Sequence, residues 1–359
     1  MATATPQLTV IVPALDEAEQ LPVLLRSLAA QQGLRLEVVL ADGGSQDGSP
    51  AAAARDAERL GLDLHIVAAP RGRARQLNAG AAAARAPELL FLHADSGLPD
   101  PHQLARALAS LQRERSARGH HRVAGHFGLR FARSCTRPSR AYYFYEAKTL
   151  LNDPGCIRGD QGFLLSAEYL RDLGGYDATH PYLEDSRLAR EIGRTGVWVN
   201  LPGTLHTSAR RFEAEGLRQR QTLNAMLCNF DHIGLHGYFA AAADAYRKQG
   251  DAGWLELPPF YRLAHRMMAA DGVGSMLKYW YRTGRYIAGN AWQLAFALDC
   301  RANQRDGWPP GRGPRLWLGR YRRWGGWLVE SVVAGAATAL LTAGWSYGGR
   351  AWARLRRGA

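Results

Sequence analysis

Four short apolar runs alternate with helical segments in the first hundred residues, and this alternation constrains the fold more than any other feature. The runs are continuous, as in strands buried on both faces, and lie at Leu8–Val12, Leu36–Leu40, Leu64–Val67 and Leu89–Leu92. The segments between them have helical character: Glu17–Gln31, Pro50–Leu60 and Arg73–Arg85. Such alternation predicts a parallel sheet with right-handed crossovers, which binds ligands beyond the carboxyl ends of its strands.

The middle of the chain continues this pattern less regularly and then becomes helical. Further strands are expected at Ala124–Phe131, Gly162–Ser166 and Val197–Leu201, with helices at Arg140–Leu151 and Glu184–Arg194. A long helical stretch is predicted from Glu213 to Gln249, and scattered aromatic residues follow it to about Asp299. The sequence therefore predicts an α/β fold with a mostly parallel central sheet, plus a helical C-terminal region.

Composition narrows the class of protein. A chain of 359 residues with 47% apolar and 21% charged residues is globular, with one large domain and an appendage or with two domains. The chain has four cysteines, Cys135, Cys156, Cys228 and Cys300. They are widely spaced and form no CxxC pair, which argues against a structural zinc site or a disulfide framework. The N-terminal residues do not resemble a signal peptide. We therefore expect a cytoplasmic catalytic domain.

The end of the chain differs in kind from the rest. From Arg301 onward there are 11 arginines against two acids, +9 of the net charge of +13, and six of the ten tryptophans. Such a tail suits an anionic surface, either a membrane or a nucleic acid. Residues 328–347 match a bilayer core in length and carry one charge, so they are a candidate membrane helix. Because small residues dominate this segment, a helix lying in the membrane surface and a soluble helical cap remain alternatives.

Acidic residues follow the first two predicted strands at the edge where ligands bind. Asp16 and Glu17 come after the first strand, although acids are also common at helix starts. Asp42 and Gly43 follow the second strand in a glycine-rich turn, where a carboxylate accepts hydrogen bonds from a base or ribose. A purely structural turn is the alternative.

A third acid follows the fourth strand in the sequence His93-Ala94-Asp95. A carboxylate there is a suitable ligand for Mg²⁺ or Mn²⁺, which bridges to phosphate oxygens. By itself Asp95 could instead cap a turn. Three acidic strand ends on one edge favour a common binding site.

Several stretches together resemble the family-two glycosyltransferases of the GT-A (nucleotide-diphospho-sugar transferase) fold. They are TVIVPALDEA, VVLADGGSQDGS, RGRARQLNAGAAAA, LLFLHADS, Gly159–Gly162, Tyr182–Asp185 and His206–Phe212. The motifs His93-Ala94-Asp95 and Thr207–Arg211 resemble the bacterial subgroup found beside radical-SAM and selenium-related genes. The resemblance covers about residues 7 to 235, so we expect a glycosyltransferase domain at 1–235. A helical extension would occupy 236–305 and a basic, Trp-rich tail 306–359.

The resemblance implies a role for each matching residue. Asp185 would be the general base of an inverting transfer, with Glu184 as the alternative. The metal, Mg²⁺ or Mn²⁺, would be held by Asp95 with His93 and His206, although His93 stands where the family usually has an acid. The nucleotide sugar would be bound by Pro13, Asp16, Glu17, Asp42, Gly43, Arg71, Arg73, Asn78, Asp160, Gln161, Arg210 and Arg211. The last two arginines replace the family's usual QxxRW motif and would neutralise the diphosphate.

The expected function is transfer of a sugar from a UDP- or GDP-linked donor to a hydroxyl. From the tail, the acceptor is expected to be lipid-linked or part of an envelope glycan, at the inner face of the cytoplasmic membrane; no nucleic-acid partner is expected. One alternative is a nucleotidyltransferase, but its glycine-rich basic loop is missing after the first strand, where this chain has PALDEA. The other is a degenerate, non-catalytic protein that binds membranes or nucleic acid through the tail.

Overall fold

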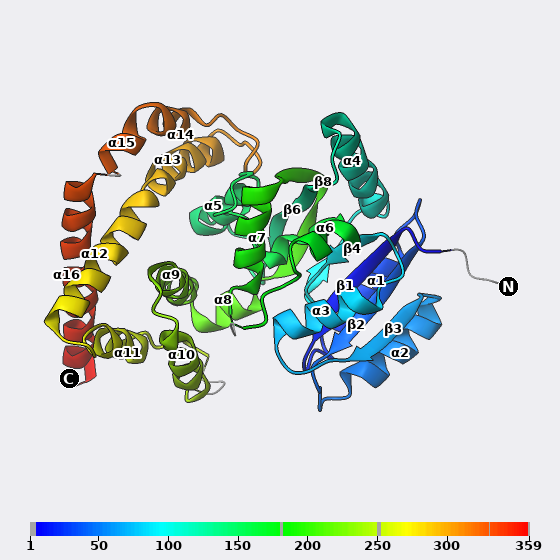
Figure 1. The fold of residues 1–359 in the computed structure, drawn as a ribbon, viewed down its shortest axis with the longest axis horizontal. Coiled ribbons are helices and arrows are strands. Elements are labelled where there is room, and N and C mark those ends of the chain that lie inside the picture. Colours follow the sequence, from blue (N-terminus) through cyan, green and yellow to red (C-terminus); the bar gives the residue numbers. More distant parts are fainter. Residues whose placement is uncertain (1–4, 180–181, 250–252, 330, 358–359) are drawn as a thin grey trace. The chain divides into compact units, whose positions relative to one another are not determined.

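The computed structural model describes residues 5–179, 182–249, 253–329 and 331–357. The chain divides into two compact units, Met1–Ser208 and Ala209–Ala359 (Figure 1). The strands of the described residues all lie in the first unit, and the second is built from helices. The division falls where the last strand ends, whereas the sequence places the end of the first domain at 235.

The sheet of the first unit has the strand order β3-β2-β1-β4-β7-β6-β8-β5. Its first four strands are parallel and match the predicted apolar runs closely: β1 (Leu8–Ala14), β2 (Leu36–Asp42), β3 (Leu64–Ala68) and β4 (Glu88–Phe91). The helices between them also lie where the sequence places them: α1 (Leu21–Ala29), α2 (Ser49–Leu60) and α3 (Arg73–Ala83). This half of the sheet confirms the predicted parallel architecture.

The other half of the sheet mixes parallel and antiparallel pairs. β7 (Phe163–Ser166) is antiparallel to β4 and to β6 (Val123–Ala132), and β6 is parallel to β8 (Val197–Ser208). The short β5 (Ser96–Gly97) pairs with the end of β8. The remaining elements of the unit are α4 (Gln103–Arg118), α5 (Arg140–Lys148), the 3₁₀ turn η1 (Gly159–Gln161), α6 (Ala167–Asp172) and α7 (Glu184–Thr195).

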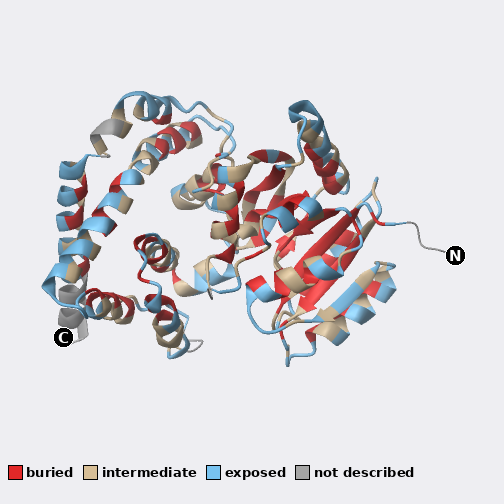
Figure 2. Ribbon diagram, in the orientation of Figure 1, coloured by how far each residue is buried: buried red, intermediate tan, exposed pale blue. Residues whose placement is uncertain are grey.

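Two apolar clusters form the core of this unit, one on each face of the sheet. One cluster joins the sheet to α1, α2 and α4, and the other joins it to α3, α6 and α7. The apolar residues of β1, β2 and β4 are almost fully buried, as the continuous runs predict. β3 departs from this prediction because it is the edge strand: His65, Ile66 and Ala68 are exposed (Figure 2).

The second unit consists of helices around its own apolar core. They are α8 (Arg210–Glu215), α9 (Leu217–Ile233), α10 (Gly237–Arg247), α11 (Pro258–Met268), α12 (Val273–Gly289), α13 (Trp292–Arg305), α14 (Leu316–Arg320), the π turn η2 (Tyr321–Gly325), α15 (Gly326–Val329) and α16 (Val332–Arg357). The single predicted stretch from Glu213 to Gln249 is three helices, since Gly216 and Gly234 adopt positive φ and end the preceding helix. No helix in the described part of the chain is long and apolar enough to cross a membrane, α16 included, so a spanning helix at 328–347 is not found.

Candidate functional site

The loop after β2 holds the Asp42 carboxylate in a fixed orientation. Its oxygens accept hydrogen bonds from the backbone N–H groups of Gly44 and Ser45, at 3.1 and 3.2 Å, and from Ser45 Oγ at 2.5 Å. Asp42 is half-buried at the carboxyl end of its strand. The position predicted to bind a base or ribose is therefore preorganised by its own turn.

The loops after β1 and β2 are locked together by side chains. Oδ1 of Asp16 accepts a hydrogen bond from the backbone of Gln46 at 2.7 Å, and the backbone N–H of Asp16 donates to Ser45 Oγ at 2.9 Å. The backbone N–H of Glu17 donates to Ser49 Oγ at 2.9 Å. These bonds place the predicted acids Asp16 and Glu17 against the Asp42 loop, so the two loops act as one unit.

Gln76, which the sequence analysis missed, joins the two strands beneath these loops. Its buried Nε2 donates to the carbonyls of Ala14 and Ala41, at 2.6 and 3.0 Å. These carbonyls lie at the carboxyl ends of β1 and β2. A Cβ on Gly43 would lie only 2.9 Å from the same amide, which accounts for glycine at that position. The residue lies within the stretch RGRARQLNAG, but nothing in its type or spacing indicates this contact.

Asp185 lies at the start of α7 with both carboxylate oxygens bonded. Oδ2 accepts from the backbone N–H of Gly159 at 2.7 Å, and Oδ1 from the backbone N–H of Ser186 at 2.6 Å. Burial alone would raise its pKa, but the Gly159 bond and the nearby charges of Arg158, Arg73 and His93 hold that pKa below its ordinary value. Asp185 is thus an ionised carboxylate at neutral pH.

The adjacent acid, Glu184, has the opposite environment. It is almost fully buried, and burial together with the charge of Asp185 raises its pKa. The exposed Arg73 is its charge partner, with Nη1 lying 3.7 Å from Oε1 of Glu184. Two neighbouring carboxyls with pKa values pushed apart favour distinct roles, with Asp185 as the ionised one.

Asp160 is the most perturbed carboxyl group of the site. Its Oδ1 is buried without a hydrogen-bond partner in the structure. Burial, followed by the charges of Asp185 and Asp95, raises its pKa from 3.8 to about 7. Asp95 in turn accepts a hydrogen bond of 3.4 Å from Thr207 Oγ1 on β8. Asp95, Asp160 and Asp185 therefore form one electrostatically coupled group from three separate segments.

The donor chemistry of this group fits a divalent cation. Mg²⁺ and Mn²⁺ prefer oxygen ligands, and the unpartnered Asp160 Oδ1 is an oxygen that a cation would satisfy. His93 is close to Asp185 as well: its Nε2 would lie 3.2 Å from a Cβ placed on Gly159, which would also lie 3.3 Å from Oδ2 of Asp185. His93, a predicted metal ligand, thus lies near the predicted base.

A small pocket opens beside the two acids at the start of α7. It is lined by Arg73, Leu77, Phe91, Leu92, His93, Gly159, Tyr176, Glu184 and Asp185. Asn78 shapes it indirectly, because its amide exchanges two hydrogen bonds of 2.8 Å with the backbone of Tyr176. The ring of Tyr176 packs edge-on against Phe91. Asn78 therefore positions Tyr176, one wall of the pocket, because it binds both the backbone N–H and the carbonyl of that residue.

Backbone strain in the described residues concentrates at this site. Asp16 and Leu183 are the non-glycine residues there with positive φ, at 56° and 63°. Asp16 lies in the loop after β1, and Leu183 immediately precedes Glu184 and Asp185. A left-handed leucine is disfavoured sterically and persists only where the surroundings impose it, often at functional sites.

The remaining residues predicted for the site have varied positions. Pro13 lies on β1 beside the Asp42 strand, and Arg71 is exposed before α3. Gln161 is buried, and its amide donates to the carbonyl of Cys156. His206 is exposed on β8, next to the Thr207 that contacts Asp95. Arg210 and Arg211 belong to α8 in the second unit, so they remain candidates from sequence alone.

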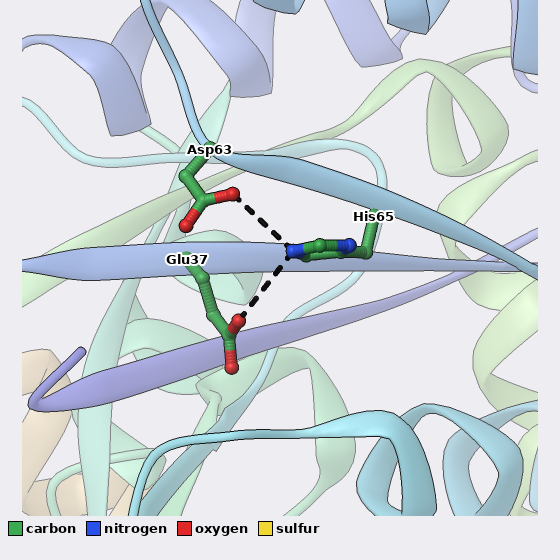
Figure 3. A group of neighbouring side chains, drawn as sticks. All are labelled: Glu37, Asp63 and His65. Carbon is green, nitrogen blue, oxygen red and sulfur yellow. Dashed lines mark ion pairs between the residues drawn. The ribbon is translucent and has the colours of Figure 1, made fainter. Parts of the chain in front are cut away.

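A second charged cluster lies at the amino ends of β2 and β3. Nε2 of His65 lies 3.3 Å from Asp63 and 3.9 Å from Glu37, a geometry that could suit a metal (Figure 3). However, Arg85 already bonds both carboxylates, Glu37 through Nε and Asp63 through Nη2, each at 2.5 Å. Glu37 also accepts hydrogen bonds from Thr9 and from the Arg85 backbone, and its pKa is lowered. These contacts make the cluster an ion-pair network that ties the edge of the sheet together.

The sheet order and the acidic loops at its carboxyl edge define the first unit as an α/β fold of the GT-A type. Residues 9–174 match the model of glycosyl transferase family 2. This match concerns the family as a whole and does not distinguish the radical-SAM-associated subgroup that the sequence analysis predicts.

Individual known proteins match more locally. Glycosyltransferases of PGL/p-HBAD biosynthesis from Mycobacterium bovis and Mycobacterium tuberculosis are 38% identical over 107 residues, 30% of this chain and 42% of theirs. This chain thus spans less than half the length of these relatives. Among solved structures, a mannosyltransferase from Pyrobaculum calidifontis in complex with GDP-Man and Mn²⁺ aligns with a TM-score of 0.49 at 22% identity, covering 94% of this chain and 88% of that one.

Proposed function

We propose that this protein is an inverting, metal-dependent glycosyltransferase that transfers a sugar from a nucleotide-diphosphate donor to a hydroxyl group. The observation that carries the proposal is the coupled group of Asp95, Asp160 and Asp185, in which Asp185 is held ionised and Oδ1 of Asp160 is buried without a hydrogen-bond partner. The family-2 match over residues 9–174 supports the same reaction class.

Asp185 would act as the general base. Inversion requires a carboxylate that accepts the proton of the acceptor hydroxyl as its oxygen attacks the anomeric carbon. The N–H groups of Gly159 and Ser186 keep the carboxylate oriented and ionised, so no rearrangement is needed before it receives that proton. Glu184, with its raised pKa and its contact with Arg73, instead helps to hold Arg73 at the pocket.

The donor would bind at the carboxyl ends of β1 and β2. The preorganised Asp42 carboxylate would accept hydrogen bonds from the nucleoside, and Asp16 and Glu17 would flank it. Arg71 and Arg73 would neutralise the diphosphate, and from the sequence alone Arg210 and Arg211 are candidates for the same role. Pro13 and Gly43 would let the backbone approach the donor closely.

A divalent cation, Mg²⁺ or Mn²⁺, fits the oxygen-rich side of the site. Asp95 and Asp160 would hold it, with His93 and His206 as further candidate ligands. When bound, such an ion offsets the negative charge that develops on the departing diphosphate.

The finer assignments follow from the sequence. The donor would be UDP- or GDP-linked, and the protein would belong to the bacterial subgroup found beside radical-SAM and selenium-related genes. The acceptor would be lipid-linked or part of an envelope glycan, at the inner face of the cytoplasmic membrane, with no nucleic-acid partner.

A panel of UDP- and GDP-sugars tests the proposal. Hydrolysis or transfer should occur with Mn²⁺ or Mg²⁺ and should disappear in Asp95→Ala and Asp185→Ala. Glu114→Gln, at a partly exposed acid on α4, is the matched control and should keep full activity. Full activity in both site variants would overturn the assignment, and pyrophosphate release from a nucleoside triphosphate would favour a nucleotidyltransferase instead.

A further inference from the structure

The exposed face of α16 is entirely uncharged over residues 332–348. The exposed residues of this stretch are Val332, Val333, Ala336, Ala337, Leu340, Leu341, Gly344, Trp345, Tyr347 and Gly348. Leu340 and Leu341 are 77% and 75% exposed, unusually high values for large apolar side chains. These residues recur at helical spacing and make an apolar strip about 25 Å long. We call it the α16 face.

The opposite side of α16 accounts for the folding of the helix. Gly335 and Ala339 pack closely against Gly284 of α12, and Ser346 Oγ bonds the ring of His265 on α11 at 2.8 Å. Figure 2 shows these two sides as alternating exposed and buried segments along the helix. The buried side therefore anchors α16. Within the α16 face, Trp345 and Tyr347 also pack against Tyr261 and His265 of α11, whereas Leu340 and Leu341 stay exposed.

Arginines and tryptophans are paired immediately before α16. The guanidinium of Arg320 lies 5.2 Å from the ring centre of Trp317, and that of Arg323 lies 5.1 Å from the ring centre of Trp324. These residues are exposed, as is Arg322. In the sequence, four more arginines follow the α16 face: Arg350, Arg354, Arg356 and Arg357. The apolar strip is therefore bracketed by basic segments.

The charge of the second unit points to an anionic partner. Residues 209–359 contain 22 Lys and Arg against 10 Asp and Glu, which is almost all of the net charge of +13. A second copy of this unit would be repelled by that charge. A nucleic acid would use the arginines and could stack bases on the tryptophans, but it offers no apolar surface that buries a strip of valine and leucine side chains. An anionic lipid surface satisfies both features, since headgroups attract arginine and the acyl boundary accepts the apolar strip.

We propose that the α16 face, with the Arg320–Trp324 segment, is a docking surface for an anionic lipid bilayer, on which α16 lies in the plane of the interface. Tryptophans at the end of the strip and arginines beyond it are the side chains expected at headgroup depth. This inference rests on the membrane-face location in the proposed function and gives that location a specific surface.

Flotation of the full chain with vesicles tests the inference. Binding is expected to vesicles of phosphatidylcholine with phosphatidylglycerol, to be much weaker with phosphatidylcholine alone, and to fall with added salt. The double variant Leu340→Asp/Leu341→Asp should lose binding at least about tenfold, because two apolar anchors become charged. Arg322→Glu/Arg323→Glu should lose a similar factor through the headgroup attraction.

Matched controls separate this surface from general effects of charge or folding. Arg247→Glu/Lys248→Glu makes the same charge change at the exposed C-terminal end of α10, and Val23→Asp introduces an acid at an exposed apolar position of α1. Both should retain binding. Circular dichroism and donor hydrolysis should be unchanged in the α16 variants, so a failure of the transferase proposal is measured separately from a failure of docking.

Three outcomes would overturn the inference. The first is vesicle binding that survives both double variants. The second is self-association in solution that Leu340→Asp/Leu341→Asp abolishes, which would make the α16 face a dimer contact. The third is salt-sensitive nucleic-acid binding, lost in the arginine variant, without vesicle binding.

Discussion

The backbone N–H of Gly159 donates a 2.7 Å hydrogen bond to Oδ2 of Asp185, and so connects the turn before β7 to the start of α7. This bond lowers the pKa of a carboxyl group whose burial would otherwise raise it. It also brings the two segments so close that a Cβ on Gly159 would lie 3.1 Å from the Cβ of Asp185. Glycine at 159 is thus part of how Asp185 is kept ionised.

Substitution of Gly159 should impair catalysis through this contact. In Gly159→Ala the new methyl group would crowd Asp185 on one side and His93 on the other, at 3.1 and 3.2 Å. Displacing a general base by a fraction of an ångström is expected to lower kcat at least about tenfold. Steady-state kinetics at neutral pH checks this. Gly289→Ala, where nothing lies within 4 Å of the added Cβ, should behave as wild type; unchanged kcat in Gly159→Ala would contradict the prediction.

Neutralising each of the two adjacent acids, Asp185 and Glu184, should have different effects on kcat and on donor affinity. Asp185→Asn removes the proposed proton acceptor and should lower kcat by about 10²- to 10⁴-fold while leaving donor binding largely intact. Glu184→Gln removes a carboxyl whose pKa is already raised by burial, so kcat should fall much less and the change should appear mainly in donor affinity through Arg73. Kinetics with calorimetric measurement of donor binding distinguishes the two.

Equal losses of kcat in both variants would contradict this division of roles. A larger loss in Glu184→Gln would exchange them and make Glu184 the base. Asp172→Asn, at a partly exposed acid at the end of α6, provides the control for removing one negative charge from the unit.

Asp160 should make folding stability depend on pH. Its pKa is about 7 in the folded chain, against an ordinary value of 3.8. Between these values the unfolded chain has lost the proton while the folded chain retains it, so stability falls as pH rises from about 4 to 7 and levels off above. Asp160→Asn carries no such charge. Without divalent cations it should therefore be more stable than wild type at pH 8 by up to about 4 kcal/mol, and by less at pH 5.

Urea unfolding in the presence of EDTA at the two pH values measures this difference. Adding Mn²⁺ at pH 8 should raise the stability of wild type more than that of Asp160→Asn, because the ion neutralises the charge that the variant lacks. A stability difference independent of both pH and Mn²⁺ would contradict the assignment of the raised pKa to Asp160.

The sequence predicts the positions of β1, β2 and β4 because buried strands leave long apolar runs and the acids that follow them start loops. It places Asp42 and Asp95 at the site for the same reason, whereas Asp185, at the start of a helix, is predicted only from the family resemblance. It could not predict the raised pKa of Asp160, which depends first on burial and then on the charges of Asp185 and Asp95, both distant in the sequence. The sequence also could not predict that β3 is exposed, since only the strand order places it at the edge of the sheet. The contacts of Gln76 could not be predicted either, because a glutamine in an alanine-rich helix has no distinctive sequence pattern.

Gln76 should support both the stability of the sheet and the binding of the donor. Its Nε2 bonds the carbonyls of Ala14 and Ala41 directly below the loops that carry Asp16 and Asp42. Gln76→Met keeps the size of the side chain but leaves two buried carbonyls without their donor, so unfolding should become easier by about 1–3 kcal/mol. The donor KM should rise with little change in kcat, because the loops lose their fixed spacing. Gln31→Met removes similar bonds, to the carbonyl of Asp100 and from the N–H of Leu104, away from the site. It should cost comparable stability and leave KM unchanged; a matching rise in KM in both variants would mean that Gln76 acts only on folding.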